Sequence, residues 1–196
     1  MFHDIPEQIR GAMAALERRD ELDRANGTAH LERLRQIPAE TGRFIALMAA
    51  SAPAGSIIEI GTSGGYSTLW LALACRGTGR SVTTYEVLDH KARLARQTFH
   101  DAGVDDVVTS IEAKFLDRVH EIGEVAFCFL DAEKDVYRDC YEAVVPALVP
   151  GGLLIADNAI SHHDDLREMI DRALDDPRVD ATVLTVGKGE LVCRKC

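Results

Sequence analysis

The sequence has no run of apolar residues long enough to span a bilayer, and it has no excess of basic residues. Among its 196 residues, 22 Lys and Arg stand against 32 Asp and Glu, which gives a formal net charge of −10. This balance argues against nucleic acid or an anionic membrane as the main partner. The polar N-terminus predicts no signal peptide. We therefore expect a cytoplasmic protein that acts on a small molecule, with no nucleic acid and no membrane as partner.

Internal repeats, linker-like stretches and a dense cysteine framework are also missing. The five cysteines lie mostly in apolar runs, and we interpret them as reduced thiols, with Cys196 at the surface. The length is that of one domain of ordinary size that can bury a proper core. Residues 1–196 are therefore predicted to form a single domain.

The first 52 residues are predicted to be helical. Apolar residues recur at helical spacing from residue 5 to about residue 24 and indicate an amphipathic helix. A short helix is predicted around Leu31 to Arg35, and Pro38 suits the first turn of another helix. Residues 1–52 thus form a helical preface to a core of residues 56–196.

The stretch from Ser56 to Leu71 organises the rest of the chain. It begins with a β-branched apolar run, which is typical of a parallel strand covered on both faces. The glycines of Gly61-Thr-Ser-Gly-Gly65 follow and let a ligand approach the main chain closely. Helical spacing begins at Tyr66. A strand that ends in glycines and opens a helix predicts a nucleotide-binding turn.

Beyond this turn, strands and helices alternate. Strands are predicted at 57–60, 81–86, 107–111, 125–130 and 153–156, helices at 66–76, 89–101, 137–148 and 164–174, and an antiparallel hairpin at 179–186 and 190–194. Asp89 is expected to cap the second of these helices. The alternation predicts an α/β fold, a doubly wound Rossmann-like sheet that is mostly parallel. In such sheets, ligands bind at the carboxyl ends of the strands.

Acidic residues follow three of the predicted strands. Glu86 ends the second strand, 25 positions after Gly61, where a carboxylate can accept both hydroxyls of a ribose. The alternative is an acid that only complements the dipole of the next helix. Asp131 follows the fourth strand, and Asp157-Asn158 follows the fifth. If these two strands are neighbours, the three side chains converge as hard oxygen ligands for Mg²⁺ or Ca²⁺. The alternative is that each acid caps a helix.

Four segments resemble metal-dependent O-methyltransferases of the class I S-adenosylmethionine (SAM) fold. They are Ile58 to Ser67, Tyr85-Glu86, Leu130 to Tyr137 and Gly151 to Asn158. The chain is similar to the catechol and caffeoyl-CoA O-methyltransferases, especially to their small bacterial type, over nearly its whole length. The Asp-Ala-Glu-Lys segment together with Ala-Asp-Asn is specific, whereas the glycine turn alone is not.

The resemblance implies a role for each matching residue. Glu59, Gly61, Thr62 and Ser67 would hold the methionine end of the cofactor, Glu86 would bind its ribose, and Ala113 with Lys114 would border its adenine. Tyr66 and Asp131 would also bind the cofactor, while Asp131, Asp157 and Asn158 would hold a divalent cation. Mg²⁺ is the expected cation, with Ca²⁺ and Mn²⁺ as alternatives. Lys134 would act with Asp131 at the catalytic centre, beside the acceptor hydroxyl, as base or electrostatic partner; its alternative is a solvated lysine at a helix start. The resemblance also implies a homodimer.

The chain departs from this family in two places. Glu112 stands where these enzymes often have glycine before the adenine contact, and the longer substrate-binding insertion of the plant and animal enzymes is missing after Asn158. The acceptor pocket is therefore expected to be more open, or to be completed by the N-terminal helices or a second subunit. His162 and His163 either line that pocket, contact the metal, or lie at the surface before the next helix.

The predicted function is methyl transfer from SAM to a hydroxyl of a small, catechol-like aromatic acceptor, assisted by a divalent cation. Two alternatives stay open at this point. One is a nicotinamide-dependent oxidoreductase, although the G-x-x-G-G spacing differs from the G-x-G-x-x-G of NAD-binding turns. The other is a non-catalytic SAM-binding module.

Overall fold

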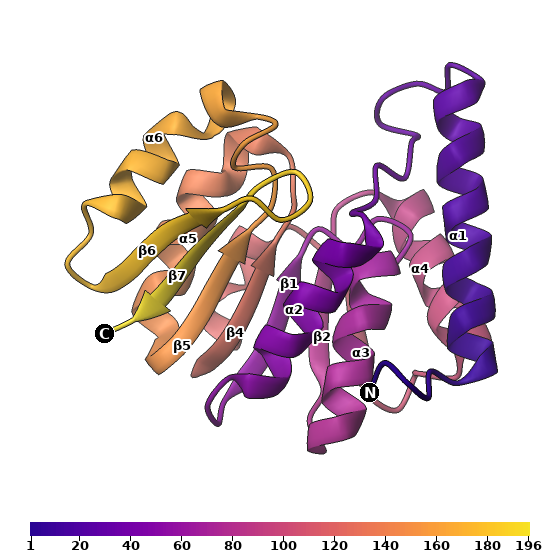
Figure 1. The fold of residues 1–196 in the computed structure, drawn as a ribbon, viewed down its shortest axis with the longest axis horizontal. Helices are drawn as coiled ribbons and strands as arrows, with labels where there is room; N and C mark the ends of the chain where they lie inside the picture. The colour runs from indigo at the N-terminus through magenta and orange to yellow at the C-terminus, as the bar shows by residue number, and fades with distance from the viewer.

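A seven-stranded sheet runs through the middle of the molecule and carries helices on both faces (Figure 1). The computed structural model describes all 196 residues. The strands are β1 (Ser56–Ile60), β2 (Val82–Glu86), β3 (Val108–Glu112), β4 (Val125–Leu130), β5 (Leu148–Ala156), β6 (Val179–Leu184) and β7 (Glu190–Lys195). The α-helices are α1 (Glu7–Ala25), α2 (Ala39–Ser51), α3 (Tyr66–Thr78), α4 (Asp89–Ala102), α5 (Tyr137–Val144) and α6 (His163–Leu174). Three short 3₁₀ helices complete the fold, η1 (Phe115–Glu121), η2 (Lys134–Val136) and η3 (Val145–Ala147).

The strand order is β3-β2-β1-β4-β5-β7-β6. The first five strands pair in parallel, and β7 pairs antiparallel with both β5 and β6. This confirms the predicted doubly wound sheet with an antiparallel C-terminal hairpin. The chain reverses its direction of winding at β1, so β1 and β4 lie at the centre of the sheet and the switch point lies between them.

Each face of the sheet has its own hydrophobic core. Successive side chains of a strand point to opposite faces, and β4 therefore contributes Phe127 and Phe129 to one core and Cys128 and Leu130 to the other. The first core packs against α1 to α4 and the second against α5 and α6. In Figure 1, α1 stands beside α4 at one edge of the molecule and α6 covers β6 near the other edge.

Three local predictions were wrong. Residues around Leu31 to Arg35 form a turn instead of a helix, because the Leu34 N–H donates to Oδ2 of Asp23 at 3.2 Å and Arg35 adopts a positive φ of 52°. The helix predicted at 137–148 ends at residue 144, since η3 follows and β5 already begins at Leu148. Asp89 is the first residue of α4 and makes no capping bond; it pairs with Arg93 one turn later.

The cysteines are free, as predicted, and four of the five are buried. Cys196 is exposed, whereas Cys193, which lies three positions before it, is buried in the sheet. None of the helices is both long and apolar enough to cross a membrane.

Candidate active site

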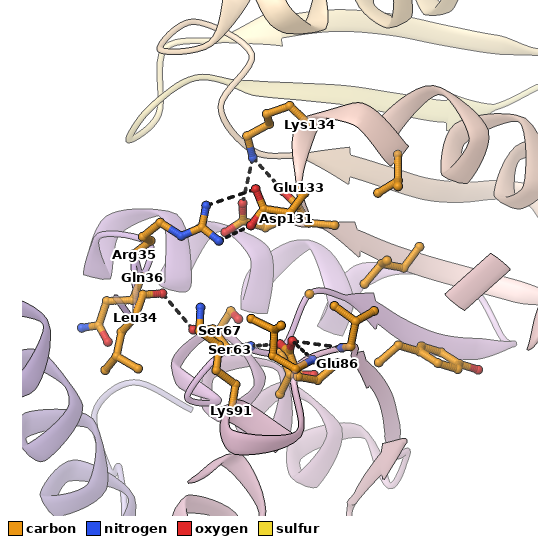
Figure 2. A pocket seen from close by; sticks show the side chains of 18 of the residues that line it. Leu34, Arg35, Gln36, Ser63, Ser67, Glu86, Lys91, Asp131, Glu133 and Lys134 are labelled. Atoms are coloured by element: carbon orange, nitrogen blue, oxygen red, sulfur yellow. Dashed lines mark hydrogen bonds and ion pairs between the residues drawn. The ribbon is translucent and has the colours of Figure 1, made fainter. Parts of the chain in front are cut away.

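A cavity of about 800 Å³ opens at the carboxyl ends of β1, β2 and β4. Its walls come from the glycine turn, from the residues that follow β2, β3 and β4, and from the N-terminal segment 30–37 (Figure 2). The cavity therefore lies beside the topological switch point, where the sheet predicts a ligand site. Among the predicted residues it is lined by Gly61, Thr62, Tyr66, Ser67, Glu86, Ala113, Asp131, Lys134 and Asn158.

Gly61 allows the first turn to pass directly against the end of β4. Its φ is 103°, and an added Cβ would lie 2.1 Å from the carbonyl oxygen of Asp131. The two segments are also joined by a bond from the Asp131 N–H to the Ile60 carbonyl at 2.9 Å. Glycine is thus required here by the protein's own backbone, and this close contact brings Asp131 next to the turn.

Glu59 lies beneath the turn and does not line the cavity. Its side chain is fully buried, and Oε2 accepts hydrogen bonds from the hydroxyls of Thr68 and of Thr84, the latter at 2.6 Å. Burial raises the pKa of Glu59 to about 7, against the opposing effect of these hydrogen bonds. The structure therefore gives this carboxylate a supporting position behind the turn, where sequence reasoning had expected a direct cofactor contact.

Glu86 joins the glycine turn to the end of β2. Its Oε2 accepts the N–H of Ser63 at 2.7 Å, and its Oε1 accepts the N–H groups of Val87 and Leu88, each at 2.9 Å. The carboxylate is buried yet lines the cavity. These backbone bonds hold it in a fixed orientation and leave lone pairs for a ligand's hydroxyls.

Ala113 follows β3 and lies at the same wall. Its N–H donates to the Glu86 carbonyl at 3.0 Å, and Lys114 lines the cavity beside it. Glu112, the residue that departs from the family pattern, does not line the cavity and pairs instead with Arg96 at 3.0 Å. Ala113 and Lys114 therefore line the cavity although Glu112 precedes them.

The ends of β4 and β5 bring the three predicted metal ligands together. The register places Leu130 opposite Ala156, so Asp131 and Asp157 follow at the same level. The Nδ2 atom of Asn158 donates to Oδ1 of Asp131 and to Oδ2 of Asp157, each at 3.0 Å. Because both carboxylate oxygens are bonded to one nitrogen, they are at most twice that distance apart.

Asp157 is completely buried and its Oδ1 atom has no hydrogen-bond partner. Glu190, at the start of the neighbouring strand β7, is equally buried, and its Oε1 accepts a bond from Thr41 at 3.2 Å. Burial raises the pKa of both acids, and the next cause is the charge of Asp131 for Asp157 and the charge of Asp157 for Glu190. Sequence reasoning did not predict that Glu190 lies beside Asp157. The one available signal was that an acid begins the last predicted strand.

Lys134 points toward the same group of carboxylates (Figure 2). Its Nζ lies 3.4 Å from Oδ1 of Asp131, 3.0 Å from the Ala132 carbonyl and 2.8 Å from the Tyr137 hydroxyl. Burial lowers the pKa of Lys134, and the carboxylate of Asp131 opposes that shift. The lysine is thus mostly enclosed and is not a freely solvated residue at a helix start.

The N-terminal segment 30–37 forms one wall of the cavity. Sequence reasoning expected the N-terminal helices to help complete the pocket but named no residues. The Leu34 carbonyl accepts a bond from the Ser63 hydroxyl at 2.8 Å, and Arg35 forms a two-point ion pair with Glu133. Figure 2 shows the Arg35 guanidinium directly against Glu133, to which dashed lines join it. His162 lines the cavity, whereas His163 lies outside it. The segment thus helps to enclose the cavity, as expected of the helical preface.

Lys91 is a further residue that sequence reasoning missed. It belongs to the first turn of α4, is only 3% exposed, and lines the cavity near Glu86. Burial, and then the charge of Arg35, lowers the pKa of Lys91. Its ammonium group makes no hydrogen bond or ion pair within the protein. No sequence motif indicates that Lys91 lines a cavity.

Comparisons with known proteins identify the family of this chain. The O-methyltransferase family profile matches residues 15–196. A catechol O-methyltransferase of Mycobacterium tuberculosis is 31% identical over 178 residues, which cover 84% of this chain and 80% of the relative. The chain belongs to the O-methyltransferase family. A caffeoyl-CoA O-methyltransferase of Medicago sativa is 26% identical, with 80% and 73% of the two chains covered.

A solved structure of another family member supports the same assignment. The O-methyltransferase of Bacillus cereus, in complex with S-adenosylhomocysteine (SAH), superposes with a TM-score of 0.77 at 26% identity over 93% of this chain and 91% of that one. This chain is therefore a SAM-dependent O-methyltransferase that acts on hydroxyl acceptors. The oxidoreductase and the non-catalytic module are set aside.

Proposed function

We propose that this O-methyltransferase methylates one hydroxyl of a small aromatic acceptor that carries two adjacent hydroxyls, with the help of a divalent cation. The observation that carries the proposal is the junction of Asp131, Asp157 and Asn158 beside Lys134. Asp131, Asn158 and Lys134 line the cavity that the glycine turn opens, and the buried Asp157 is bonded to the amide of Asn158. Carboxylate and amide oxygens at one rim, next to a lysine, suit an acceptor that must lose a proton while it is methylated.

The turn and the strand ends provide the cofactor half of the site. Gly61 and Thr62 lie in the turn before α3, and Ser67 lies in its first turn. The free N–H groups at this helix start favour the carboxylate of the methionine moiety. Glu86 is oriented to accept the ribose hydroxyls, and Ala113 lies where the adenine would end. In this proposal Glu59 acts from behind the turn, by holding Thr68 of α3 and Thr84 of β2.

The residues present fit a divalent cation. Asp157 has a buried oxygen without a partner, and Asp131 with the amide oxygen of Asn158 would complete a set of hard oxygen ligands. Nowhere do three or more His, Cys, Asp or Glu side chains gather as a metal site, so water or acceptor oxygens would complete the coordination. A bound cation supplies a Lewis acid that favours the ionised hydroxyl and fixes the direction of two adjacent ones.

Lys134 acts on the acceptor hydroxyl. A phenolic hydroxyl has a pKa of about 10 and is a poor nucleophile near neutrality. The buried ammonium of Lys134 can stabilise the phenolate, and its lowered pKa brings it closer to accepting the proton itself. The phenolate oxygen then attacks the methyl carbon in line with the breaking carbon–sulfur bond, so the positions of the two reactants decide the rate. A homodimer remains a prediction from the family resemblance.

The test is methyl transfer from labelled SAM to catechol, with and without EDTA, in wild type and in Asp157→Ala. We expect EDTA and the substitution each to lower turnover at least about a hundredfold, while SAM affinity measured by calorimetry changes little. Asp164→Ala, which removes an exposed carboxylate just beyond the site, is the matched control and should retain full turnover. Full activity of the Asp157 variant in EDTA would overturn the role of the cation.

A further inference from the structure

Arg35, Lys134 and Lys188 are three of the basic residues that line the cavity. Two of these three cations have an acidic partner. Arg35 is paired with Glu133, and Lys134 lies 3.4 Å from Asp131.

Lys188 is the cation of this group that has no acidic partner within ion-pair distance. The Nζ atom of Lys188 makes one hydrogen bond, to the Gln36 carbonyl oxygen at 3.4 Å. It also lines a smaller neighbouring cavity between α1 and the start of α2, so it stands where the two cavities meet. A half-buried ammonium with one weak neutral acceptor retains hydrogen-bonding capacity for a ligand.

The hairpin between β6 and β7 is built to present this one side chain. Gly187 and Gly189 on either side have φ values of 54° and 94°, and an added Cβ would lie 2.1 Å from Thr41 Oγ1 or 2.4 Å from Ile160 Cγ1. Residue 188 is therefore the one position of the Gly-Lys-Gly turn that can carry a side chain without a clash. The turn is wedged between α2 and the segment that follows Asn158.

The backbone of Lys188 is fixed relative to the catalytic residues. Its carbonyl accepts the N–H groups of Ile160 at 3.2 Å and Ser161 at 2.9 Å, and the Gly189 carbonyl accepts the N–H of Ala159 at 2.9 Å. These bonds tie the turn to the residues directly after Asn158. Lys188 thus starts from a position that is fixed relative to Asn158.

We propose that the acceptor carries a carboxylate on its aromatic ring, on the side away from the reacting hydroxyls, and that Lys188 binds it. This inference rests on the proposed function, because it assumes a dihydroxy aromatic with its hydroxyls at Asp131 and Asn158. A charge-assisted hydrogen bond from a partly enclosed lysine favours a carboxylate over a neutral group of the same shape. Lys188 is therefore a specificity-determining residue for the acceptor.

A competing explanation is that Lys188 only balances the buried acids, since its charge opposes the raised pKa of Asp157. The two explanations differ in their dependence on the acceptor. If Lys188 acted through Asp157 alone, its removal would affect all acceptors to the same extent. If it binds a carboxylate, its removal would affect only acceptors that carry one.

The test compares 3,4-dihydroxybenzoate with 3,4-dihydroxybenzamide, which differ in charge but hardly in shape. We expect kcat/KM of the wild type to favour the benzoate about tenfold or more, mainly through KM. Lys188→Met should bring the ratio close to one, and Lys188→Arg should retain part of the preference. Lys195→Met, on the distal end of β7 and outside both cavities, is the matched control and should keep the wild-type ratio.

The outcomes separate the two proposals. Methylation of both compounds at equal kcat/KM by the wild type, or an unchanged ratio in Lys188→Met, overturns the role of Lys188 and leaves the proposed function in place. Failure to methylate either compound or catechol, despite SAM binding, overturns the proposed function itself. SAM affinity and thermal unfolding of each variant verify that the fold is intact. If the Met variant does not fold, the ratio of kcat/KM values in Lys188→Arg tests the proposal instead.

Discussion

The side-chain amide of Asn158 donates to Oδ1 of Asp131 across 3.0 Å and thereby links the ends of β5 and β4. Asn158 adopts a positive φ of 72°, and its Oδ1 atom accepts a bond from Ser161 at 3.2 Å. The amide therefore presents its hydrogens to the carboxylates. A cation at this place would need the amide oxygen instead. A half-turn of the amide group exchanges the positions of its oxygen and its nitrogen.

This arrangement predicts that Asn158→Ala weakens cation binding more than cofactor binding. Alanine removes one oxygen ligand and also leaves the two carboxylates without their shared donor. We expect Mg²⁺ affinity, measured by calorimetry in the presence of SAM, to fall about tenfold or more, while SAM affinity without Mg²⁺ changes little. Ser161→Ala retains the amide and should have the smaller effect. Equal Mg²⁺ affinity in Asn158→Ala and wild type would contradict a ligand role for the amide.

The sheet and much of the site could be predicted because they depend on local signals. The β-branched run before Gly61 indicated the central strand, and the position of acids directly after β4 and β5 was enough to bring Asp131 and Asp157 together. Strand adjacency supplied the rest, since parallel neighbours end at the same edge. The turn at residues 31–35 could not be predicted this way, because Asp23 and Ser63, which bind its backbone, are distant in sequence.

The residues that sequence reasoning missed are those whose role comes from tertiary position. Lys91 and Lys188 are ordinary lysines in a helix start and in a hairpin turn, and nothing in their neighbours marks them as buried or cavity-lining. Glu190 begins a strand that was predicted, but its burial beside Asp157 depends on the antiparallel placement of β7 next to β5. Glu59 was expected at the cofactor, whereas its side chain is buried and does not line the cavity; strand alternation alone does not show which carboxylate reaches the cavity.

The raised pKa of Glu59 predicts a stability that depends on pH. The group prefers its protonated form in the folded state, with a pKa of about 7 against 4.5 when exposed. Its stabilising contribution is therefore complete below pH 4.5 and is lost as the pH rises to 7, by roughly 3 kcal/mol in all. Glu59→Gln has no proton to lose, so its free energy of unfolding minus that of the wild type should increase over this window.

The measurement is urea unfolding of both proteins at several values between pH 5 and 8. Taking the difference between the two proteins cancels the contributions of Asp157 and Glu190, which are present in both. A difference that stays constant with pH, or that decreases as pH rises, would show that Glu59 is already ionised in the folded protein at low pH.

The charge of Lys91, which has no ion-pair partner, predicts that this residue affects the affinity for SAM differently from the affinity for its product SAH. SAM carries a positive sulfonium that SAH lacks, and a buried ammonium lining the same cavity repels that charge. In Lys91→Met the ratio of SAM affinity to SAH affinity should therefore rise about threefold or more. Arg93→Met, on the exposed side of α4, is the control and should leave the ratio unchanged. A parallel loss of both affinities would instead show that Lys91 binds a group that the two ligands share.

Gly61 and Gly77 provide opposite outcomes for the same chemical change. At Gly61, alanine would place Cβ against the Asp131 carbonyl at a φ of 103°, so β1 and β4 must separate where the cofactor and the acceptor meet. We expect Gly61→Ala to lower the free energy of unfolding by about 2 kcal/mol or more and to abolish SAM binding. Gly77 lies in the last turns of α3 with nothing within 4 Å of an added Cβ, and Gly77→Ala should stabilise the protein by about 0.5–1 kcal/mol. If Gly61→Ala unfolds at the same denaturant concentration as the wild type, the close passage of the turn against β4 does not exist in solution.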